Sequence, residues 1–216
     1  MLLRNIANAL DSSRSVLSDK TILKYNKKGL LIENKLSEAQ IQPNSIDLTL
    51  GPTWKRLKPN SSKFGCRCID PMKEAAYDSG NFKTIDENGD PTKGYFILPP
   101  KSFVLMASNE ILNIPNGILS FVQGRSSIAR LAIQTEQAGL IDAGFRGTIT
   151  FEIFNQSDNP IILYEGMRIA QVYFFKSQYA DKVYSPSKGS KYKEQIEATG
   201  SKVHLDPEFI NSNKQK

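Results

Sequence analysis

The chain has 216 residues, a length that suits one domain with a buried core. Its 28 Lys and Arg residues against 22 Asp and Glu residues give a net charge of +6, which fits a polyanionic ligand as small as a triphosphate as well as a nucleic acid. The sequence has no basic run with interleaved aromatic residues, and no apolar stretch near the ~20 residues that a membrane helix needs. We therefore expect a soluble cytoplasmic protein with neither a nucleic acid nor a membrane as its partner.

The N-terminal part of the sequence predicts an extension followed by one helix. Residues 1–15 mix polar and apolar side chains, which is typical of a loose extension and not of a signal peptide. Residues 16–25 begin with cap-type side chains and then space their apolar residues at helical intervals. We expect a short helix here, at the start of a β domain that spans residues 16–180.

The next part of the chain predicts one strand and then irregular structure. Residues 40–51 alternate between polar and apolar side chains, as a half-buried strand does. Within them, Ser45 and Asp47 are interpreted as a polar pair at a strand edge. Residues 55–94 are polar with weak periodicity, and we expect loops, a short strand pair and an insertion there.

After residue 94, short apolar runs recur at regular spacing, separated by turn sequences that contain Pro, Gly, Asn or Asp. Many short strands with few helices predict an all-β sandwich or barrel. The expected strands are Tyr95–Leu98, Ser102–Ala107, Leu119–Gln123, Gly147–Asn155, Ile161–Leu163 and Arg168–Phe175.

The stretch from Val122 to Asn155 gathers several chemically distinctive groups. The sequence Gly-Arg-Ser-Ser at 124–127 predicts a strand that ends in a short helix, where serine hydroxyls cap the first N–H groups and the helix attracts an anion such as phosphate. Arg130 would return to the serine face of that helix and add a positive charge. A serine pair after glycine is also typical of a helix cap with no further role.

The rest of this stretch predicts a bend and a strand. Residues 138–147 hold three glycines around Asp142 and Phe145, which allows a tight hairpin that approaches a ligand closely, or simply a turn. The period of two in residues 148–154 places Thr148, Thr150 and Glu152 on one face and Ile149, Phe151 and Ile153 on the other. Glu152 therefore points away from the core, as a surface glutamate or as a functional one.

Three motifs in this order resemble the dUTPase and dCTP deaminase superfamily: Gly124–Leu131 (GRSSIARL), Ala138–Gly147 (AGLIDAGFRG) and Phe151–Asn155 (FEIFN). The third looks like the deaminase branch, and the likeness runs from about Val16 to about Leu205. The resemblance implies an all-β fold of the dUTPase-like β-clip or distorted jelly-roll type with a short N-terminal helix.

The resemblance implies hydrolytic deamination of dCTP to dUTP and ammonia, which would supply dUTP as a precursor of dTTP. Glu152 would shuttle protons, because one carboxylate can accept a proton from the attacking water and donate one to the ring. Ser126 and Arg130 would hold and polarise the water and the leaving amine. The implied nucleotide-binding residues are Arg125, Ser126, Ser127, Ile128, Ala129, Arg130, Asp142, Phe145, Thr150, Phe151, Glu152, Gln171, Tyr184, Lys191 and Gln195.

Some of these residues carry a more specific expectation. Asp142 would bind the 3′-hydroxyl of deoxyribose, Phe145 would stack on the sugar or base, and the backbone at Thr150 and Phe151 would read the base edge. Gln171 would face the triphosphate, although an amide on an outer strand face is an equal alternative from the pattern alone.

The tail at residues 181–216 is rich in lysine and poor in apolar residues, which is typical of a flexible, solvated segment. Tyr184, Lys191 and Gln195 nevertheless match the C-terminal lid of the deaminase branch, which closes over the nucleotide. We expect this tail to act as that lid.

The resemblance also implies partners and a cofactor. Mg²⁺ would arrive with the triphosphate, and the chain would form a homotrimer with sites at subunit boundaries. Large apolar side chains on neighbouring strands support the trimer, because they exceed what one small β core hides. These are Phe154, Tyr173, Phe174 and Phe175.

Zinc chemistry of the common deaminase type is excluded by sequence. Zinc-dependent nucleobase deaminases need a His/Cys-x-Glu pattern followed by Pro-Cys-x-x-Cys, which this sequence lacks. Cys66 and Cys68 are too close for a comfortable disulfide and are expected to be ordinary thiols. The single histidine, His204, is typical of a surface residue. No metal site made by the protein is expected.

Three alternatives stay open at this point. A dUTPase would use Asp142 to activate water against the α-phosphate, and would need no Glu152. A bifunctional deaminase and diphosphatase would carry dCTP through to dUMP; the bend before Asp142 resembles this type but is a residue shorter, and Glu136 stands near the place of its histidine. A non-catalytic β-clip protein would have no need of both carboxylates.

Overall fold

The computed structural model describes residues 15–63, 65–135, 138–185 and 189–212. Except for Ser15, the expected N-terminal extension lies outside these residues, and so does Glu136. No helix in the described part is long and apolar enough to cross a membrane.

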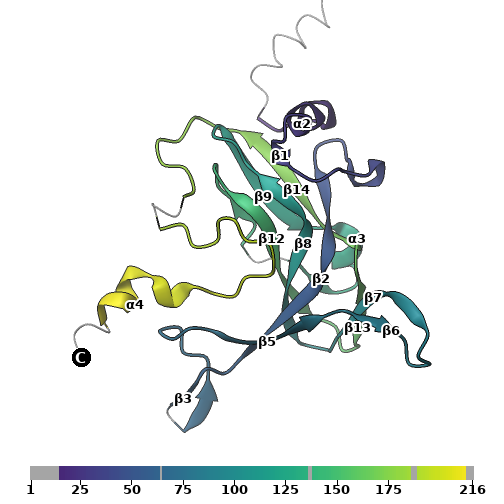
Figure 1. The fold of residues 1–216 in the computed structure, drawn as a ribbon, viewed down its shortest axis with the longest axis vertical. Coiled ribbons are helices and arrows are strands. Elements are labelled where there is room, and N and C mark those ends of the chain that lie inside the picture. The colour runs from purple at the N-terminus through teal and green to yellow at the C-terminus, as the bar shows by residue number, and fades with distance from the viewer. Residues whose placement is uncertain (1–14, 64, 136–137, 186–188, 213–216) are drawn as a thin grey trace, which may run out of the picture.

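Antiparallel strands are the main regular structure of the described chain and helices are few and short, which confirms the all-β prediction (Figure 1). The helical elements are α2 (Asp19–Asn26), η1 (Glu38–Gln40), α3 (Ser126–Ala129), η3 (Val203–Leu205) and α4 (Pro207–Ser212). The strands are β1 (Leu31–Ile32), β2 (Ile46–Lys58), β3 (Ser61–Lys63), β4 (Cys66–Cys68), β5 (Ala76–Asn81), β6 (Lys83–Ile85), β7 (Pro91–Leu98), β8 (Phe103–Asn113), β9 (Ile118–Gly124), β10 (Ile133–Gln134), β11 (Leu140–Ile141), β12 (Arg146–Asn155), β13 (Ile161–Tyr164) and β14 (Arg168–Lys176).

The long strand β2 joins the two halves of the main sheet. The main sheet has nine strands in the order β10-β12-β8-β2-β14-β9-β11, with β1 paired to β8 and β5 paired to β2. The first residues of β2 pair with β14, and its later residues pair with β8 and β5. The sheet therefore curls around a core that contains Ile46 and Leu48 of β2 together with Phe151 and Phe174, all of them 0% exposed.

Smaller sheets lie beside the main one. β13, β7 and β6 form a three-stranded sheet, and β3 and β4 form a hairpin. Cys66 and Cys68 lie on this hairpin as free thiols, as predicted.

The six strands expected after residue 94 are all present, with bounds that differ by a few residues. The N-terminal helix is also present, although it begins at Asp19 because Leu17 instead donates its backbone N–H to Phe174 in β14. The prediction for 40–51 needs correction: residues 38–40 form a 3-10 helix, and the strand runs from Ile46 to Lys58. It thus enters the region 55–94, where loops, a short strand pair and an insertion were expected. β3 and β4 form a short strand pair there, and β5 and β6 add strands that were not expected.

The apolar surface that was expected to support a trimer is not where the sequence placed it. Phe174 is fully buried in the core, and Phe154, Tyr173 and Phe175 are only partly exposed. The exposed apolar side chains include Phe121 and Leu140, which lie opposite each other on β9 and β11.

Candidate functional site

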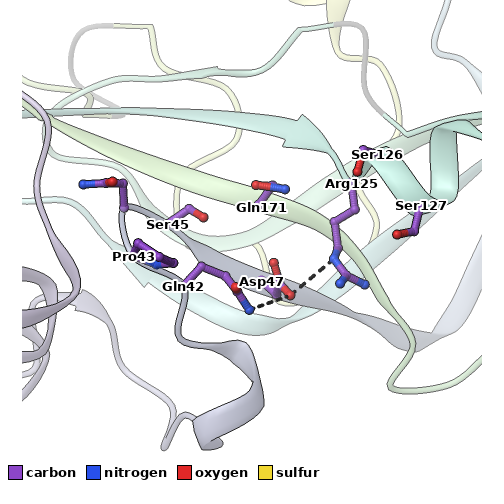
Figure 2. A pocket seen from close by; sticks show the side chains of 9 residues that line it. Gln42, Pro43, Ser45, Asp47, Arg125, Ser126, Ser127 and Gln171 are labelled. Atoms are coloured by element: carbon purple, nitrogen blue, oxygen red, sulfur yellow. Dashed lines mark hydrogen bonds and ion pairs between the residues drawn. The ribbon is translucent and has the colours of Figure 1, made fainter.

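A polar pocket of about 310 Å³ lies where β9 ends and α3 begins (Figure 2). Strand pairing creates it, because Gln171 of β14 lies between Asp47 of β2 and Gln123 of β9. The side chains of Arg125, Ser126 and Ser127 follow β9 directly into this space. The full lining is Gln42, Pro43, Asn44, Ser45, Asp47, Arg125, Ser126, Ser127 and Gln171.

A buried aspartate fixes one wall of this pocket. Asp47 is 1% exposed, and its Oδ2 lies 3.2 Å from Nε of Arg125 and 3.0 Å from Nη1 of Arg168. Gln42 donates a further hydrogen bond to the same oxygen at 3.4 Å. Burial raises the pKa of Asp47 above its usual range, while Arg125 and Arg168 act in the opposite direction. The carboxylate thus orients Arg125, whose Nη1 also donates to the backbone oxygen of Arg168 at 3.0 Å.

The serine turn has a different local structure from the one expected. Arg125 is the N-cap of α3, and no side chain makes the cap hydrogen bond, so the prediction of serine capping is wrong. Ser126 and Ser127 occupy the first turn and line the pocket with exposed side chains. Their hydroxyls can therefore donate to a ligand. An arginine, three serine hydroxyls and three side-chain amides make the pocket suitable for an anion with several oxygens.

The remaining residues of α3 face different ways. Ile128 is 4% exposed and packs in the core, so its side chain cannot line a binding site. Ala129 and Arg130 are exposed, and the backbone N–H of Arg130 donates to the oxygen of Ser126 at 3.1 Å. Arg130 therefore stands at the end of the short helix with its side chain outside the core.

Strand β12 holds the predicted catalytic carboxylate and the predicted base-reading residues. Glu152 lies opposite Leu105 of β8, its side chain is half-buried, and its backbone N–H donates to Thr135 at 3.2 Å. The neighbouring Phe151 is 0% exposed, which leaves only its backbone to contact a ligand, as expected. The pairing of β12 with β8 is irregular between Thr148 and Thr150, beside the expected base edge.

The predicted tail is not simply a solvated segment. Gln195 donates from Nε2 to the backbone oxygen of Thr148 at 2.7 Å, and the backbone N–H of Thr148 donates to the oxygen of Gln195 at 2.8 Å. Thr199 donates its N–H to Oγ1 of Thr150 at 3.0 Å. Ala198, between these contacts, is 1% exposed. This segment therefore docks on β12, and its flexibility stays a prediction.

The other two predicted lid residues also have partners within the chain. Lys191 pairs with Asp206 at 2.7 Å, and the hydrogen bond from this ammonium group to Asp206 raises the pKa of Lys191. The hydroxyl of Tyr184 accepts the N–H of Tyr192 at 3.1 Å.

Phe145 has a structural position. It is 7% exposed and meets Tyr184 edge to face, with ring centroids 5.7 Å apart. The ring packs in the core where the sequence predicted a surface for stacking on a nucleotide. Phe145 therefore packs against Tyr184 from the core side.

Asp142 lies apart from the serine turn. It is exposed and lines a second pocket, of about 420 Å³, together with Tyr184 and Lys182. The flanking bend is not the hairpin that was expected, because β11 pairs with β9 while β12 pairs with β8. The fold brings Arg125, Ser126, Ser127 and Gln171 into one pocket and places Asp142 and Tyr184 in the other.

Sequence reasoning missed several residues of the first pocket. Gln42, Asn44 and Arg168 received no role, and Asp47 was given an architectural one. The available signal was the polar run from Gln42 to Asp47 directly before an apolar strand. Nothing local in the sequence shows that its aspartate meets two distant arginines.

Comparisons with known proteins agree with the predicted relationship. A model of the family described as dCTP deaminase-like matches residues 16–177. A protein of Sulfurihydrogenibium sp. named "dCTP deaminase, dUMP-forming" is 39% identical over 191 residues, covering 88% of this chain and 98% of that protein. A protein of Haloarcula marismortui named "dCTP deaminase" is 38% identical over 198 residues, covering 90% of this chain and 97% of that protein.

A solved structure supports the fold. The crystal structure of 2′-deoxycytidine 5′-triphosphate deaminase from Agrobacterium tumefaciens superposes with a TM-score of 0.58 and 24% sequence identity. The match covers 76% of this chain and 49% of the other, so this chain spans about half of that protein's length.

Proposed function

The chain belongs to the dCTP deaminase-like family, and we propose that it catalyses the hydrolytic deamination of dCTP. The observation that carries this proposal is the family match over residues 16–177, which includes the serine turn, Asp142 and Glu152. The relatives that align along nearly their whole length are named as deaminases of this nucleotide.

The proposed reaction needs one proton shuttle. Water attacks C4 of cytosine and passes its first proton through Glu152 to ring N3. The C4 hydroxyl of the resulting intermediate then gives its remaining proton through Glu152 to the amino group, so that ammonia leaves and a carbonyl forms. Ser126 and Arg130 hold the water and the amine from the exposed side of α3. The half-buried position of Glu152 on β12 supports this role, because partial burial removes competing water.

The triphosphate is proposed to bind in the pocket of Figure 2. Arg125, Ser126, Ser127 and Gln171 offer donors there. Asp47 supports the site by holding Arg125 at 3.2 Å in the orientation that faces the pocket. Mg²⁺ would arrive with the triphosphate as part of the substrate.

The base and the sugar are proposed to bind along β12 and the bend before it. The backbone at Thr150 and Phe151 would read the base edge, and Asp142 would take the 3′-hydroxyl. Gln195 and Lys191 would close over the nucleotide from the tail, with Tyr184 beside them. The contacts of Gln195 with Thr148 support this arrangement, because they place the tail at the proposed base edge.

A second reaction at the same site has its own support. Relatives from Sulfurihydrogenibium and Dictyoglomus carry the name "dCTP deaminase, dUMP-forming". We propose that Asp142 activates a second water against the α-phosphate, which releases diphosphate and leaves dUMP.

The proposed site is completed by other copies of the chain in a homotrimer. The division of Arg125 and Asp142 between two pockets supports this proposal, because one nucleotide would then draw on more than one subunit. Light scattering should give three times the 24.1 kDa mass of one chain; the mass of a monomer would contradict the proposal.

Product analysis tests the function. Incubation with dCTP, and separately with dUTP, should be followed by resolving ammonia, dUTP, dUMP and diphosphate. We expect ammonia from dCTP, and dUMP with diphosphate if the second reaction occurs. Formation of dUMP from dUTP without ammonia release from dCTP would identify a dUTPase and contradict the primary proposal.

A further inference from the structure

We propose that Tyr77 of β5 is a positioning residue that seats residues 194–201, the docking segment, against β12. Its effect on the nucleotide rests on the proposed function, since the docking segment contains Gln195. The seat itself is a property of the folded chain and can be measured without a nucleotide. The proposal gives β5, which lies between β2 and β7 in the chain, a role in holding the docking segment.

The contact between Tyr77 and the docking segment is close and polar. The Tyr77 hydroxyl accepts the backbone N–H of Ser201 at 2.8 Å. A Cβ atom added at Gly200 would lie 2.3 Å from a ring carbon of Tyr77, closer than non-bonded atoms approach. Glycine at this position therefore lets the chain pass directly over the ring.

An apolar contact continues this seat onto the main sheet. Ala198 is 1% exposed and packs with Leu105 and Ala107 of β8, and Tyr77 and Phe103 lie against the same cluster. Because Ala198 has a short side chain, the backbone of the docking segment must lie close to the surface on which Ala198 is buried. Tyr77 supplies the outer wall of that surface, because β5 pairs with β2 beside β8.

The docking segment is held at both ends. Before Gln195, Glu194 donates its backbone N–H to the oxygen of Arg146 at 2.7 Å, and its side chain pairs with the Arg146 guanidinium. After it, residues 198–201 are held by Thr150 and Tyr77. Gln195 lies between the two anchors, with its amide on Thr148. Loss of the Tyr77 anchor would weaken the attachment after Gln195, where the Thr199 hydrogen bond to Thr150 and the buried Ala198 would remain.

Hydrogen exchange in the nucleotide-free protein tests the seat directly. In Tyr77→Phe the N–H of Ser201 loses its acceptor, and we expect exchange across residues 195–201 to rise about three- to tenfold, the size expected for one hydrogen bond. Tyr95→Phe is the matched control, since it removes a tyrosine hydroxyl that donates to Ile85 in a separate sheet. Equal exchange in Tyr77→Phe and wild type would overturn the proposal.

A double-mutant cycle separates the seat from a general loss of folding. Gly200→Ala should increase exchange of the docking segment about tenfold or more, because the new methyl group collides with the ring. In the Tyr77→Ala background the same change should have little further effect, since the ring is gone. If Gly200→Ala acts equally in both backgrounds, Tyr77 is not the seat. Unchanged exchange in the paired amides of β9 and β14, which do not contact the docking segment, would verify that the domain stays folded.

The link to the nucleotide is then tested by kinetics with dCTP. Tyr77→Phe and Gly200→Ala should lower kcat/KM, and the variant with the larger increase in exchange of the docking segment should show the larger loss. Tyr95→Phe should leave kcat/KM unchanged. Altered exchange with unaltered kcat/KM would overturn the positioning role. Absence of ammonia release by the wild-type protein would instead contradict the proposed function. The exchange results would still show whether Tyr77 holds the docking segment on β12.

Discussion

The pocket at the end of β9 and the surface of β12 are held in place by different kinds of contact. The pocket rests on three adjacent strands, and a buried aspartate fixes the orientation of Arg125 inside it. The β12 surface carries Glu152, and its first half, Arg146 to Thr150, contacts the docking segment through backbone and side-chain hydrogen bonds, an ion pair and one buried alanine. The first arrangement is built into the sheet, and the second depends on a segment outside it.

This difference suggests a division of work within the proposed site. A pocket for a triphosphate benefits from fixed charges, because orienting a donor in advance lowers the cost of binding. A surface that must admit and release a base benefits from a cover that can open, since product release often needs such motion. The two regions should therefore respond differently to substitution, in chemistry, in binding and in stability.

The largest expected effect is on chemistry at β12. Glu152→Gln keeps the shape of the side chain and removes its proton transfer, so deamination should fall by roughly 10²- to 10⁴-fold. Nucleotide binding, measured by calorimetry with dCTP, should change little. Glu87→Gln, at an exposed position, is the control. Retention of more than a few per cent of the activity would show that Glu152 is not the shuttle.

Removal of the cover is expected to have the next largest effect. A chain that ends at Val183 loses Tyr184, Lys191 and Gln195, and kcat/KM should fall by roughly 10²-fold, the size expected for two charge-assisted hydrogen bonds. The fold should survive, because the main sheet does not depend on these residues. A chain that ends at Asp206 keeps the Lys191 ion pair and serves as control. Unchanged kinetics in the shorter chain would show that the tail takes no part in turnover.

The pocket should respond mainly in stability. Asp47→Ala removes the oxygen that accepts from Arg125, Arg168 and Gln42, and we expect a loss of about 2 to 3 kcal/mol in the free energy of unfolding, the size of two hydrogen bonds to charged groups discounted because both arginines stay partly exposed. KM for dCTP should rise as well, because Arg125 loses its orientation. Urea unfolding measures the first effect. Asp78→Ala, which breaks an exposed ion pair with Lys58, should cost much less; equal costs would contradict the comparison.

The sequence predicted the strands well because their signal is local. From Thr150 onward the alternation in β12 reports directly which side chains face the core, and Phe151 and Ile153 are 0% exposed as expected. The alternation is wrong at Thr148, which is 4% exposed although it was predicted on the outer face, because the pairing with β8 is irregular between Thr148 and Thr150. The serine turn was placed correctly for the same reason, since its residues follow one another directly at the end of a strand.

The parts that were missed depend on contacts between distant residues. Asp47 was interpreted as a polar edge residue, and its partner Arg168 lies 121 positions away. The tail was expected to be solvated because its apolar content is low, but it docks through hydrogen bonds, an ion pair and one small buried side chain, which composition does not reveal. Phe145 stands among glycines in the sequence, and only the fold shows that it packs against Tyr184 in the core.

The smallest expected effect concerns the support beneath the pocket. Glu110 is 4% exposed and accepts hydrogen bonds from Gln40 at 2.7 Å and from the backbone and hydroxyl groups of Thr49 at 2.8 and 2.6 Å. Gln40 also donates to the backbone oxygen of Asp47 at 3.1 Å, which connects this carboxyl group to the pocket wall.

Burial raises the pKa of Glu110 above its usual value of 4.5, even though these hydrogen bonds act against it. The folded protein therefore holds this proton at pH values where the unfolded chain has lost it. The resulting contribution to stability is fully present below pH 4.5 and is lost as the pH rises through the raised pKa. Because the side chain in Glu110→Gln does not titrate, the free energy of unfolding of wild type relative to Glu110→Gln should decrease from pH 4.5 upward. Glu87→Gln, at an exposed position, should show no such decrease; a difference between wild type and Glu110→Gln that stays constant with pH would show that burial of this carboxyl group does not govern its titration.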